Sequence, residues 1–328
     1  MLETTPLISI ILPVYNRIEF VSQAIESVLG QSYNNWELIV ADDASKPNVH
    51  SFLKEYNDHE RICVHFNKEN LGLFPNLNRA IESSKGSYIL LLCSDDKLLP
   101  ECLESSLRTL KQYPEAGLLL SAFRTIVETG EEVESGSIYY YRQFLDQSVV
   151  LSSPLESLSL LLQHGSINGN LTGMFFERKL YEKIGQFEEN SFQVSDWEWV
   201  YRVARKTPIV LSQNPVAMVR RHEKQLSNKN FKNLNNSLEV SAMIRLLLRD
   251  PLTADIPSAQ KWATHIMHYH LWFAFKFFLK GDALSTLTLI QSVHKTTGLL
   301  QTAIALLRWL PQRWQVYRNN TFAMPPAK

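Results

Sequence analysis

Residues 7–45 decide the fold of this chain, and they read LISIILPVYNRIEFVSQAIESVLGQSYNNWELIVADDAS. Residues 7–14 form an apolar, β-branched run that is typical of a strand buried on both faces. Apolar residues then recur through 17–29 with the period of a helix, and a second apolar run at 36–41 predicts another strand. A strand, a helix and a strand in this order make up the unit of a parallel sheet.

The same alternation continues to about residue 123. We expect further strands at 61–66, 88–93 and 117–123, with helices at 47–56, 74–84 and 100–112. The sequence therefore predicts an α/β fold with a mostly parallel central sheet and helices on both faces, similar to a Rossmann arrangement. Such sheets bind ligands at the carboxyl ends of their strands, so the residues that follow each strand are the first candidates for function.

The pattern is less regular after residue 128. Residues 128–150 are polar and predict a loop. They precede a helix at 155–163, a strand at 171–176, helices at 179–184 and 195–205, and short strands at 209–211 and 216–220. From about 230 to 314 the chain has helical periodicity only. We expect one α/β domain over 1–228 and a helical C-terminal region over 229–328.

Composition excludes several classes of protein. The chain has 328 residues, of which 45% are apolar and 20% charged, and this is typical of a folded globular protein. Its 33 basic and 33 acidic residues balance, which argues against a nucleic-acid partner. The three cysteines, Cys63, Cys93 and Cys102, are too few for a disulfide framework, and no signal peptide or spanning helix is evident. We expect a cytoplasmic protein.

The C-terminal region has its own charge balance. Residues 257–328 contain eight basic residues and one acid, Asp282. Trp309 and Trp314 lie beside Arg308 and Arg313, a combination that favours peripheral contact with an anionic membrane at its inner face. The alternative is that the helically spaced aromatic residues of this region pack as core.

Two pairs of aspartates follow predicted strands. Asp42-Asp43-Ala44-Ser45 follows the second strand, where carboxylates can accept hydrogen bonds from a base and a sugar hydroxyl. Ser94-Asp95-Asp96 follows the strand at 88–93, where a divalent cation would relieve the repulsion between the carboxylates and bridge to a diphosphate. Both stretches are also ordinary turn sequences.

Two further motifs lie in the second half of the domain. Ser195-Asp196-Trp197-Glu198 has the spacing of a capping box, and Asp196 would also serve as a general base whose pKa the helix dipole lowers. In Arg220-Arg221-His222 the imidazole suits a metal ion and the arginines suit phosphate, although a lone histidine is more often structural. Glycine-rich dinucleotide, P-loop and nucleophile-elbow motifs are absent from the sequence.

In their order and spacing these residues resemble the family-2 glycosyltransferases, inverting enzymes with the GT-A nucleotide-sugar fold. The resemblance covers about residues 6–228 and rests on Pro13-Val14-Tyr15-Asn16-Arg17, Asp42–Ser45, Asn70-Leu71-Gly72, Asn76, Asn78, Ser94-Asp95-Asp96, Pro100, Gly173, Gly185-Gln186-Phe187, Asp196-Trp197-Glu198, His222 and Ser227. It implies a nucleotide-binding half at about 1–125 and an acceptor half at about 126–228.

The resemblance also implies roles for single residues. For the nucleotide, Pro13 and Tyr15 would flank the base and Asp42 would accept the uracil N–H. For the metal, Asp96 would bind Mg²⁺ or Mn²⁺, Asp95 would contact the ribose or bridge to the metal, and His222 would contact metal or phosphate. Asp196 would be the catalytic base. The implied partners are a nucleotide-sugar donor, with UDP as the expected nucleotide, and a saccharide or lipid-linked acceptor in polysaccharide or glycolipid assembly.

This sequence departs from the family pattern at three positions. Cys93 stands where many members have the first aspartate of Asp-x-Asp-Asp, Ala44 replaces a glycine, and Ser195 replaces a glutamate. A Gln-x-x-Arg-Trp motif is missing, which predicts a non-processive enzyme. Two alternatives remain. One is a catalytically degenerate nucleotide-sugar binder or scaffold. The other is a sugar nucleotidyltransferase, although the glycine-rich N-terminal loop of that class is absent.

Overall fold

The computed structural model describes residues 5–133, 141, 145–191, 193–223, 225 and 234–318 of the chain. It divides into two compact units. Unit 1 comprises Met1–Pro154 and Asn168–His222, and unit 2 comprises Leu155–Ile167 and Glu223–Lys328. All the candidate site residues of the predicted α/β domain belong to unit 1.

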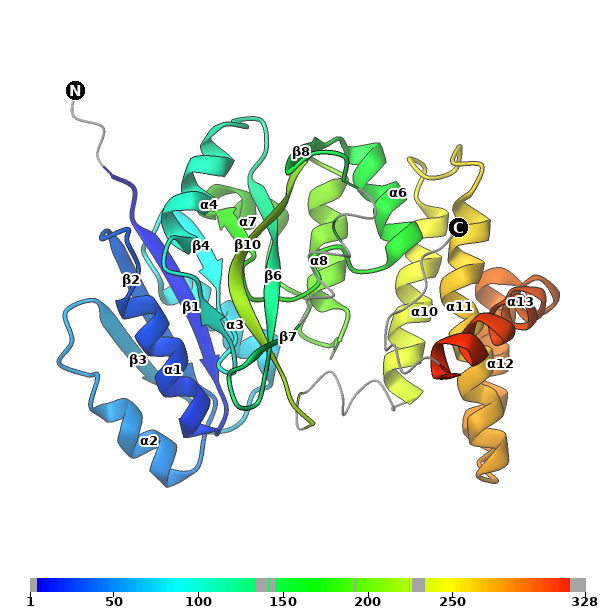
Figure 1. Cartoon of the computed structure of the whole chain (residues 1–328), viewed down its shortest axis with the longest axis horizontal. Coiled ribbons are helices and arrows are strands. Elements are labelled where there is room, and N and C mark those ends of the chain that lie inside the picture. The colour runs from blue at the N-terminus through cyan, green and yellow to red at the C-terminus, as the bar shows by residue number, and fades with distance from the viewer. Residues whose placement is uncertain are drawn as a thin grey trace. The chain divides into compact units, whose positions relative to one another are not determined.

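Unit 1 is built on a single sheet with helices on both faces, so the predicted α/β class is confirmed (Figure 1). Across the described residues the strand order is β3-β2-β1-β4-β9-β6-β10-β5, with β7 paired to β6 and β8 to β10. The strands are β1 (Ile8–Val14), β2 (Trp36–Asp42), β3 (Ile62–Phe66), β4 (Tyr88–Leu91), β5 (Lys97–Leu98), β6 (Leu118–Val127), β7 (Glu132–Val133), β8 (Val149–Ser152), β9 (Phe175–Glu177) and β10 (Ile209–Arg221).

The half of the sheet formed by β3, β2, β1 and β4 is parallel, as predicted. Val14 of β1 pairs with Asp42 of β2, which in turn pairs with Phe66 of β3. The segments that follow these strands therefore emerge at the same edge of the sheet. β1 lies between β2 and β4, and a parallel sheet whose connections diverge in this way binds ligands at the carboxyl ends of its central strands.

The other half of the sheet is mixed. β9 runs antiparallel to both β4 and β6, whereas β6 and β10 are parallel. The strand predicted at 171–176 is shorter in the structure and begins at Phe175, because Gly173 has a φ of 89° that does not continue a strand. Residues 171–174 are thereby left as a turn between the sheet and the candidate site.

β10 joins the two short strands that the sequence predicts at 209–211 and 216–220. Its register against β6 shifts between Ser212 and Ala217, where Pro215 has no N–H to donate to a ladder. The polar stretch at 128–150, predicted as a loop, also contains β7 and the start of β8. Both are short additions to the sheet edge, and periodicity over so few residues is too weak to predict them.

The helices of unit 1 bury the apolar stripes that the sequence predicts. On α1 the buried residues are Phe20, Val21, Ala24, Ile25 and Val28, and all of them except Phe20 belong to the core packed against the parallel strands. The helices are α1 (Ile18–Leu29), α2 (Pro47–Lys54), α3 (Leu73–Ser83), α4 (Cys102–Lys111), α7 (Arg178–Ile184) and α8 (Ser195–Ala204).

Unit 2 is helical, as the C-terminal periodicity predicts. It contains α10 (Leu234–Arg249), α11 (Ala259–Leu279), α12 (Ala283–Thr297) and α13 (Leu299–Arg318), together with most of α6 (Pro154–His164). Trp309 is buried, so part of the aromatic stripe packs as core. Among the helices that the structure describes, none combines the length and the hydropathy needed to cross a bilayer.

Candidate active site

Asp42 and Asp43, at the end of β2, have different surroundings. Asp43 accepts three hydrogen bonds, from the side-chain amide of Asn67 (3.0 Å) and the backbone N–H groups of Leu71 (2.8 Å) and Gly72 (3.0 Å). Asp42 accepts one on Oδ2, from the backbone N–H of Ser45 at 3.3 Å. Its Oδ1 is buried and has no hydrogen-bond partner among the described residues. Asp43 therefore holds the turn, whereas Asp42 retains an acceptor for another group.

The turn after β1 faces Asp42. Pro13 is buried in β1, whereas Tyr15, just beyond the strand, is 55% exposed. Asn16 and Arg17 both have positive φ values of 64° and 63°, which cost L-residues about 1 kcal/mol each. This strained turn directs the Arg17 side chain towards the residues that follow β4.

Arg17, Asp95 and His222 meet at the carboxyl ends of β1, β4 and β10. Nε2 of His222 lies 2.9 Å from Oδ2 of Asp95 and 2.8 Å from Nη1 of Arg17, and that guanidinium nitrogen is 3.3 Å from the same carboxylate oxygen. A single imidazole nitrogen cannot donate to the carboxylate and accept from the guanidinium at once. Whichever tautomer His222 adopts, one of these two contacts is repulsive.

Asp96 is buried, and both of its oxygens are hydrogen-bonded. Oδ1 accepts the backbone N–H of Arg220 at 2.9 Å, while Oδ2 accepts the Thr172 hydroxyl at 2.5 Å and the Asn170 amide at 3.3 Å. Burial raises the pKa of the Asp96 carboxyl to about 8, and the adjacent Asp95 adds to the rise. Its oxygens point into the protein, whereas the Asp95 side chain remains partly exposed.

Cys93 completes a group of three potential ligands with Asp95 and Asp96, whose donor atoms lie within 4.8 Å of one another. Burial is the main cause of a Cys93 thiol pKa well above the ordinary value, and the two carboxylates raise it further. The sulfur therefore stays protonated, and a thiol is a poor metal ligand. The remaining donors are oxygen and imidazole nitrogen.

Asp196 lies in the first turn of α8. Its Oδ2 accepts the Asn168 amide at 2.7 Å, and its Oδ1 accepts the backbone N–H of Trp197 at 2.8 Å. Burial raises the pKa of the Asp196 carboxyl, although both hydrogen bonds oppose the rise. The expectation that the helix dipole lowers this pKa is wrong, because the loss of solvent outweighs it.

The predicted capping box at Ser195 does not form. Ser195 is the first residue of α8 and donates its hydroxyl to the Glu188 carbonyl at 2.7 Å, and the residue before it, Val194, caps the helix without a side-chain bond. The Glu198 carboxylate pairs with Arg202, four residues on, at 2.8 and 3.0 Å. The helix start is therefore anchored to a neighbouring loop rather than capped by its own side chains.

The segment 168–172 connects the two halves of the candidate site. Asn168 binds Asp196, while Asn170 and Thr172 bind Asp96. These roles were not predicted, because Asn168 and Asn170 lie between an expected helix and an expected strand, and Thr172 lies within that strand. The available signal was the run Asn168-Gly169-Asn170, followed shortly by Gly173, since two positive-φ glycines and two amides favour a polar turn.

Arg220 is structural rather than a phosphate ligand. Its guanidinium donates to the Asp95 and Val127 carbonyls at 3.0 and 3.2 Å and to Gln23 Oε1 at 2.8 Å. The side chain is 1% exposed. It therefore fixes the position of the segment that contains Asp95 and Asp96.

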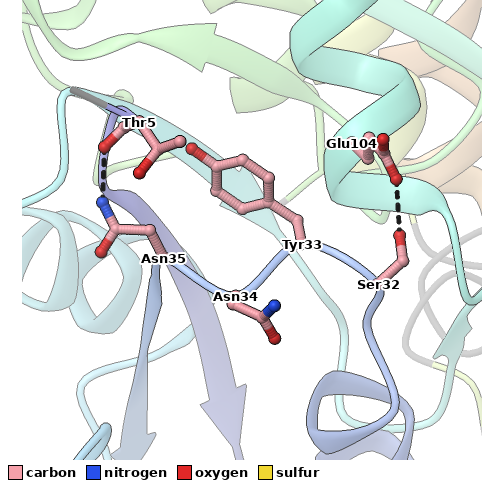
Figure 2. Close-up of a pocket in the computed structure, with 6 residues that line it drawn as sticks. All are labelled: Thr5, Ser32, Tyr33, Asn34, Asn35 and Glu104. Atoms are coloured by element: carbon pink, nitrogen blue, oxygen red, sulfur yellow. Dashed lines mark hydrogen bonds between the residues drawn. The ribbon is translucent and has the colours of Figure 1, made fainter. Parts of the chain in front are cut away.

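A separate hollow of about 520 Å³ lies at the opposite edge of the sheet, near the amino ends of β1 and β2 (Figure 2). Two of its polar side chains are already engaged there. Ser32 donates to Glu104 at 2.9 Å and Asn35 to the Thr5 carbonyl at 2.6 Å (Figure 2). Because it lies at the amino ends of the strands, this hollow is not part of the site formed by the aspartates.

The sequence profile of the family described as "Glycosyl transferase family 2" matches residues 9–185, more than half of the chain. The chain belongs to glycosyltransferase family 2. A glycosyltransferase of Rickettsia typhi is 30% identical over 224 residues, which are 68% of this chain and 67% of the relative. TuaG of Bacillus subtilis, named for teichuronic acid biosynthesis, is 39% identical over 103 residues, which are 31% of this chain and 41% of TuaG.

The fold of this family-2 glycosyltransferase is also similar to that of a solved structure. TarS 1-349 of S. aureus, in complex with UDP-GlcNAc, aligns with a TM-score of 0.68 over 97% of this chain and 93% of that one. The sequence identity is 15%, so the likeness concerns the fold alone. The GT-A architecture expected from the sequence is thereby confirmed.

Proposed function

We propose that this family-2 glycosyltransferase transfers a sugar from a UDP-sugar to a hydroxyl of a saccharide or lipid-linked acceptor, with inversion at the anomeric carbon, in polysaccharide or glycolipid assembly. One observation carries the proposal. The segment 168–172 donates hydrogen bonds to Asp196 at one end and to Asp96 at the other, which supports one site for the proposed general base and the proposed diphosphate contact. UDP as the nucleotide is supported by the named ligand of TarS and awaits the test below.

The uridine would lie at the ends of β1 and β2. The unpartnered, buried Oδ1 of Asp42 is suited to accept an N–H such as that of uracil N3, because an unsatisfied buried acceptor is costly until a donor arrives. Exposed Tyr15 offers a ring on which the base would stack, whereas buried Pro13 leaves little surface for such a contact.

We propose that a divalent cation, Mg²⁺ or Mn²⁺, is held by Asp95 and His222. Carboxylate oxygen with imidazole nitrogen suits such ions. The Arg17 guanidinium lies 2.8 Å from Nε2 of His222 and 3.3 Å from Oδ2 of Asp95, so it would move aside when the ion binds. The resemblance implies Asp96 as the metal ligand and gives Asp95 two alternative roles, contact with the ribose or a bridge to the metal. Asp96 would instead position Asp95, because both of its oxygens already accept hydrogen bonds. When bound, the ion would stabilise negative charge on the leaving diphosphate.

Asp196 would act as the general base. The acceptor hydroxyl would transfer its proton to a carboxylate oxygen of Asp196 as its own oxygen forms a bond to the anomeric carbon. The bond from that carbon to the diphosphate oxygen would break on the opposite side, and the electron pair would leave with UDP. The raised pKa makes Asp196 a stronger base than an ordinary aspartate, and Asn168 fixes its orientation.

Calorimetry tests donor binding. UDP, GDP, CDP and dTDP are titrated into the full chain with and without Mn²⁺, and into an Asp95→Asn variant. We expect UDP to bind with a metal-dependent affinity that Asp95→Asn reduces by roughly ten-fold or more, the effect of removing one charged ligand. Glu101→Gln, an exposed carboxylate at the start of α4, is the matched control. Equal binding of all four nucleotides, or of none, would refute the assignment.

A second experiment tests catalysis. Asp196→Asn should abolish release of UDP from the donor and leave UDP affinity nearly unchanged, because the base contacts the acceptor. Glu198→Gln, two residues along α8, makes the same chemical change without loss of activity, since that carboxylate pairs with Arg202. Nuclear magnetic resonance of the product anomer reports inversion. Wild-type protein that binds UDP but never turns over a donor would instead indicate the catalytically degenerate binder.

A further inference from the structure

The corner between α11 and α12 in unit 2 exposes large apolar side chains. The exposed fractions are 65% for Phe278, 67% for Leu279 and 77% for Leu284, and Phe275 and Leu287 are about half exposed. All five lie within residues 275–287, which we call the α11–α12 corner. Figure 1 shows the two helices antiparallel, with the corner at their common end.

Backbone and side-chain hydrogen bonds order the α11–α12 corner. The backbone N–H groups of Lys280 and Gly281 bond to the carbonyls of Phe277 and Phe278 at 3.0 and 2.9 Å, and close α11. Asp282 then caps α12 by accepting the Ser285 N–H at 3.0 Å. The apolar side chains are therefore presented by two ordered helix ends.

Core packing does not account for these side chains. The inner faces of the two helices bury another set of residues: Met267, Ala274, Thr286, Leu289 and Val293. A helix of a water-soluble protein usually places polar residues on its outer face. Clustered exposed apolar residues instead mark a contact surface for another molecule.

Charge identifies the kind of partner. Lys276 and Lys280 are exposed at the corner, and Asp282, the one acid of residues 257–328, is engaged as the cap of α12. A second copy of the chain, packed on the same surface, would bring the four lysines of the two copies together with only two carboxylates, those of Asp282. An anionic phosphate surface offers the opposite charge to both lysines.

We propose that the α11–α12 corner binds the surface of an anionic lipid bilayer, with Phe278, Leu279 and Leu284 inserted at the boundary of the headgroups and acyl chains. Lys276 and Lys280 lie at the level of the lipid phosphates. The Lys276 ammonium also lies 5.7 Å from the centre of the Trp272 ring, and this cation–π contact helps to hold the lysine at the level of the phosphates. This narrows the contact expected over residues 257–328 to thirteen residues that do not include Trp309.

The consequence for function rests on the proposed transferase activity, because a chain held at a bilayer would meet a lipid-linked acceptor there. The binding surface itself does not depend on the donor site. All of its residues belong to unit 2, whereas Asp42, Asp95, Asp196 and His222 belong to unit 1. The two proposals can therefore fail separately.

Vesicle flotation tests the surface. The full chain is mixed at low salt with one of two kinds of vesicle. The neutral vesicles are phosphatidylcholine, and the anionic vesicles also contain roughly 30% phosphatidylglycerol, which gives them a negative surface potential. We expect flotation with the anionic vesicles and much less with the neutral ones. Replacing Phe278, Leu279 and Leu284 together by serine should lower partitioning by roughly ten-fold or more, because three inserted side chains are lost. The exposed Leu252→Ser, outside the corner, should bind like the unmodified chain.

Folding and activity are followed in the same samples. Circular dichroism and calorimetry with UDP show whether the triple variant remains folded and whether unit 1 still binds nucleotide. A double variant, Lys276→Glu with Lys280→Glu, keeps the apolar residues and should lose the preference for anionic vesicles. Absence of flotation at low salt, or flotation of the triple variant like the unmodified chain, overturns the proposal. A dimer that the triple variant abolishes would assign the corner to self-association and overturn it as well.

Discussion

Replacing Asn168 by alanine should raise the pKa of Asp196 and shift the pH dependence of the proposed transfer. The Asn168 amide donates to Oδ2 of Asp196 at 2.7 Å and stabilises its charged form against the burial that raises this pKa. A hydrogen bond to a charged group contributes about 1.5–3 kcal/mol. At about 1.4 kcal/mol per pKa unit, its loss raises the pKa of Asp196 by roughly 1–2 units.

The sign follows from the role of a base. Asp196 accepts a proton only as a carboxylate, so activity is lost as the pH falls through its pKa. In Asn168→Ala this acid limb should move upwards by roughly 1–2 pH units, and activity should recover at higher pH because the carboxylate is then ionised again.

The measurement is kcat/KM for UDP release from the donor, followed across the pH range in which the protein stays folded. Asn190→Ala is the matched control, because its amide contacts Glu188 and lies outside the site. An acid limb that does not move in Asn168→Ala, with activity reduced equally at every pH, would refute the reasoning. The residue would then be structural only, or Asp196 would not be the base.

Four further predictions concern stability and binding. Thr172→Val removes the 2.5 Å hydrogen bond to buried Asp96 and should lower the free energy of unfolding by about 1–3 kcal/mol, as urea denaturation would report. Asp43→Asn should also lower the free energy of unfolding by about 1–3 kcal/mol, because the carboxylate that accepts three hydrogen bonds is replaced by an amide that is partly a donor. Asp42→Asn should instead weaken UDP binding in calorimetry, because the unpartnered acceptor oxygen is changed. Ala44→Gly should stabilise the protein by about 0.5–1 kcal/mol in thermal unfolding, because Ala44 has a φ of 57° and glycine adopts that conformation without strain.

The parallel half of the sheet could be predicted from sequence because its signals are local. Each strand from β1 to β4 is a short apolar run, and each is followed by polar residues that share one edge of the sheet. This pattern predicts that Asp42 and Asp95 lie at the same edge of the sheet. The mixed half resisted prediction, because β9 and the register shift in β10 depend on pairing between distant segments.

The sequence is enough to name candidate site residues but not to predict their contacts. The identity of a turn residue does not say which way its side chain points, and so the sequence could not tell an aspartate with a free oxygen from one with none. Asp42 and Asp43 illustrate this, since one retains an unpartnered oxygen and the other accepts three hydrogen bonds. Asn168 and Thr172 were missed for a related reason, because their partners lie 28 and 76 residues away.

The different burial of Asp95 and Asp96 also explains why the first would bind the cation and the second would position its neighbours. Two adjacent carboxylates repel each other, and the buried one carries most of the penalty, as its pKa of about 8 indicates. The hydrogen bonds from Thr172, Asn170 and the Arg220 backbone offset that penalty. Two of these bonds also fix the position of segment 168–172, which contains Asn170 and Thr172. Because segment 168–172 also contains Asn168, which donates to Asp196, the buried aspartate would help to set the geometry of the proposed base at the other end of the site. The partly exposed Asp95 would be left to contact the proposed cation and the donor. In this arrangement a carboxylate that touches no substrate would still determine where catalysis takes place.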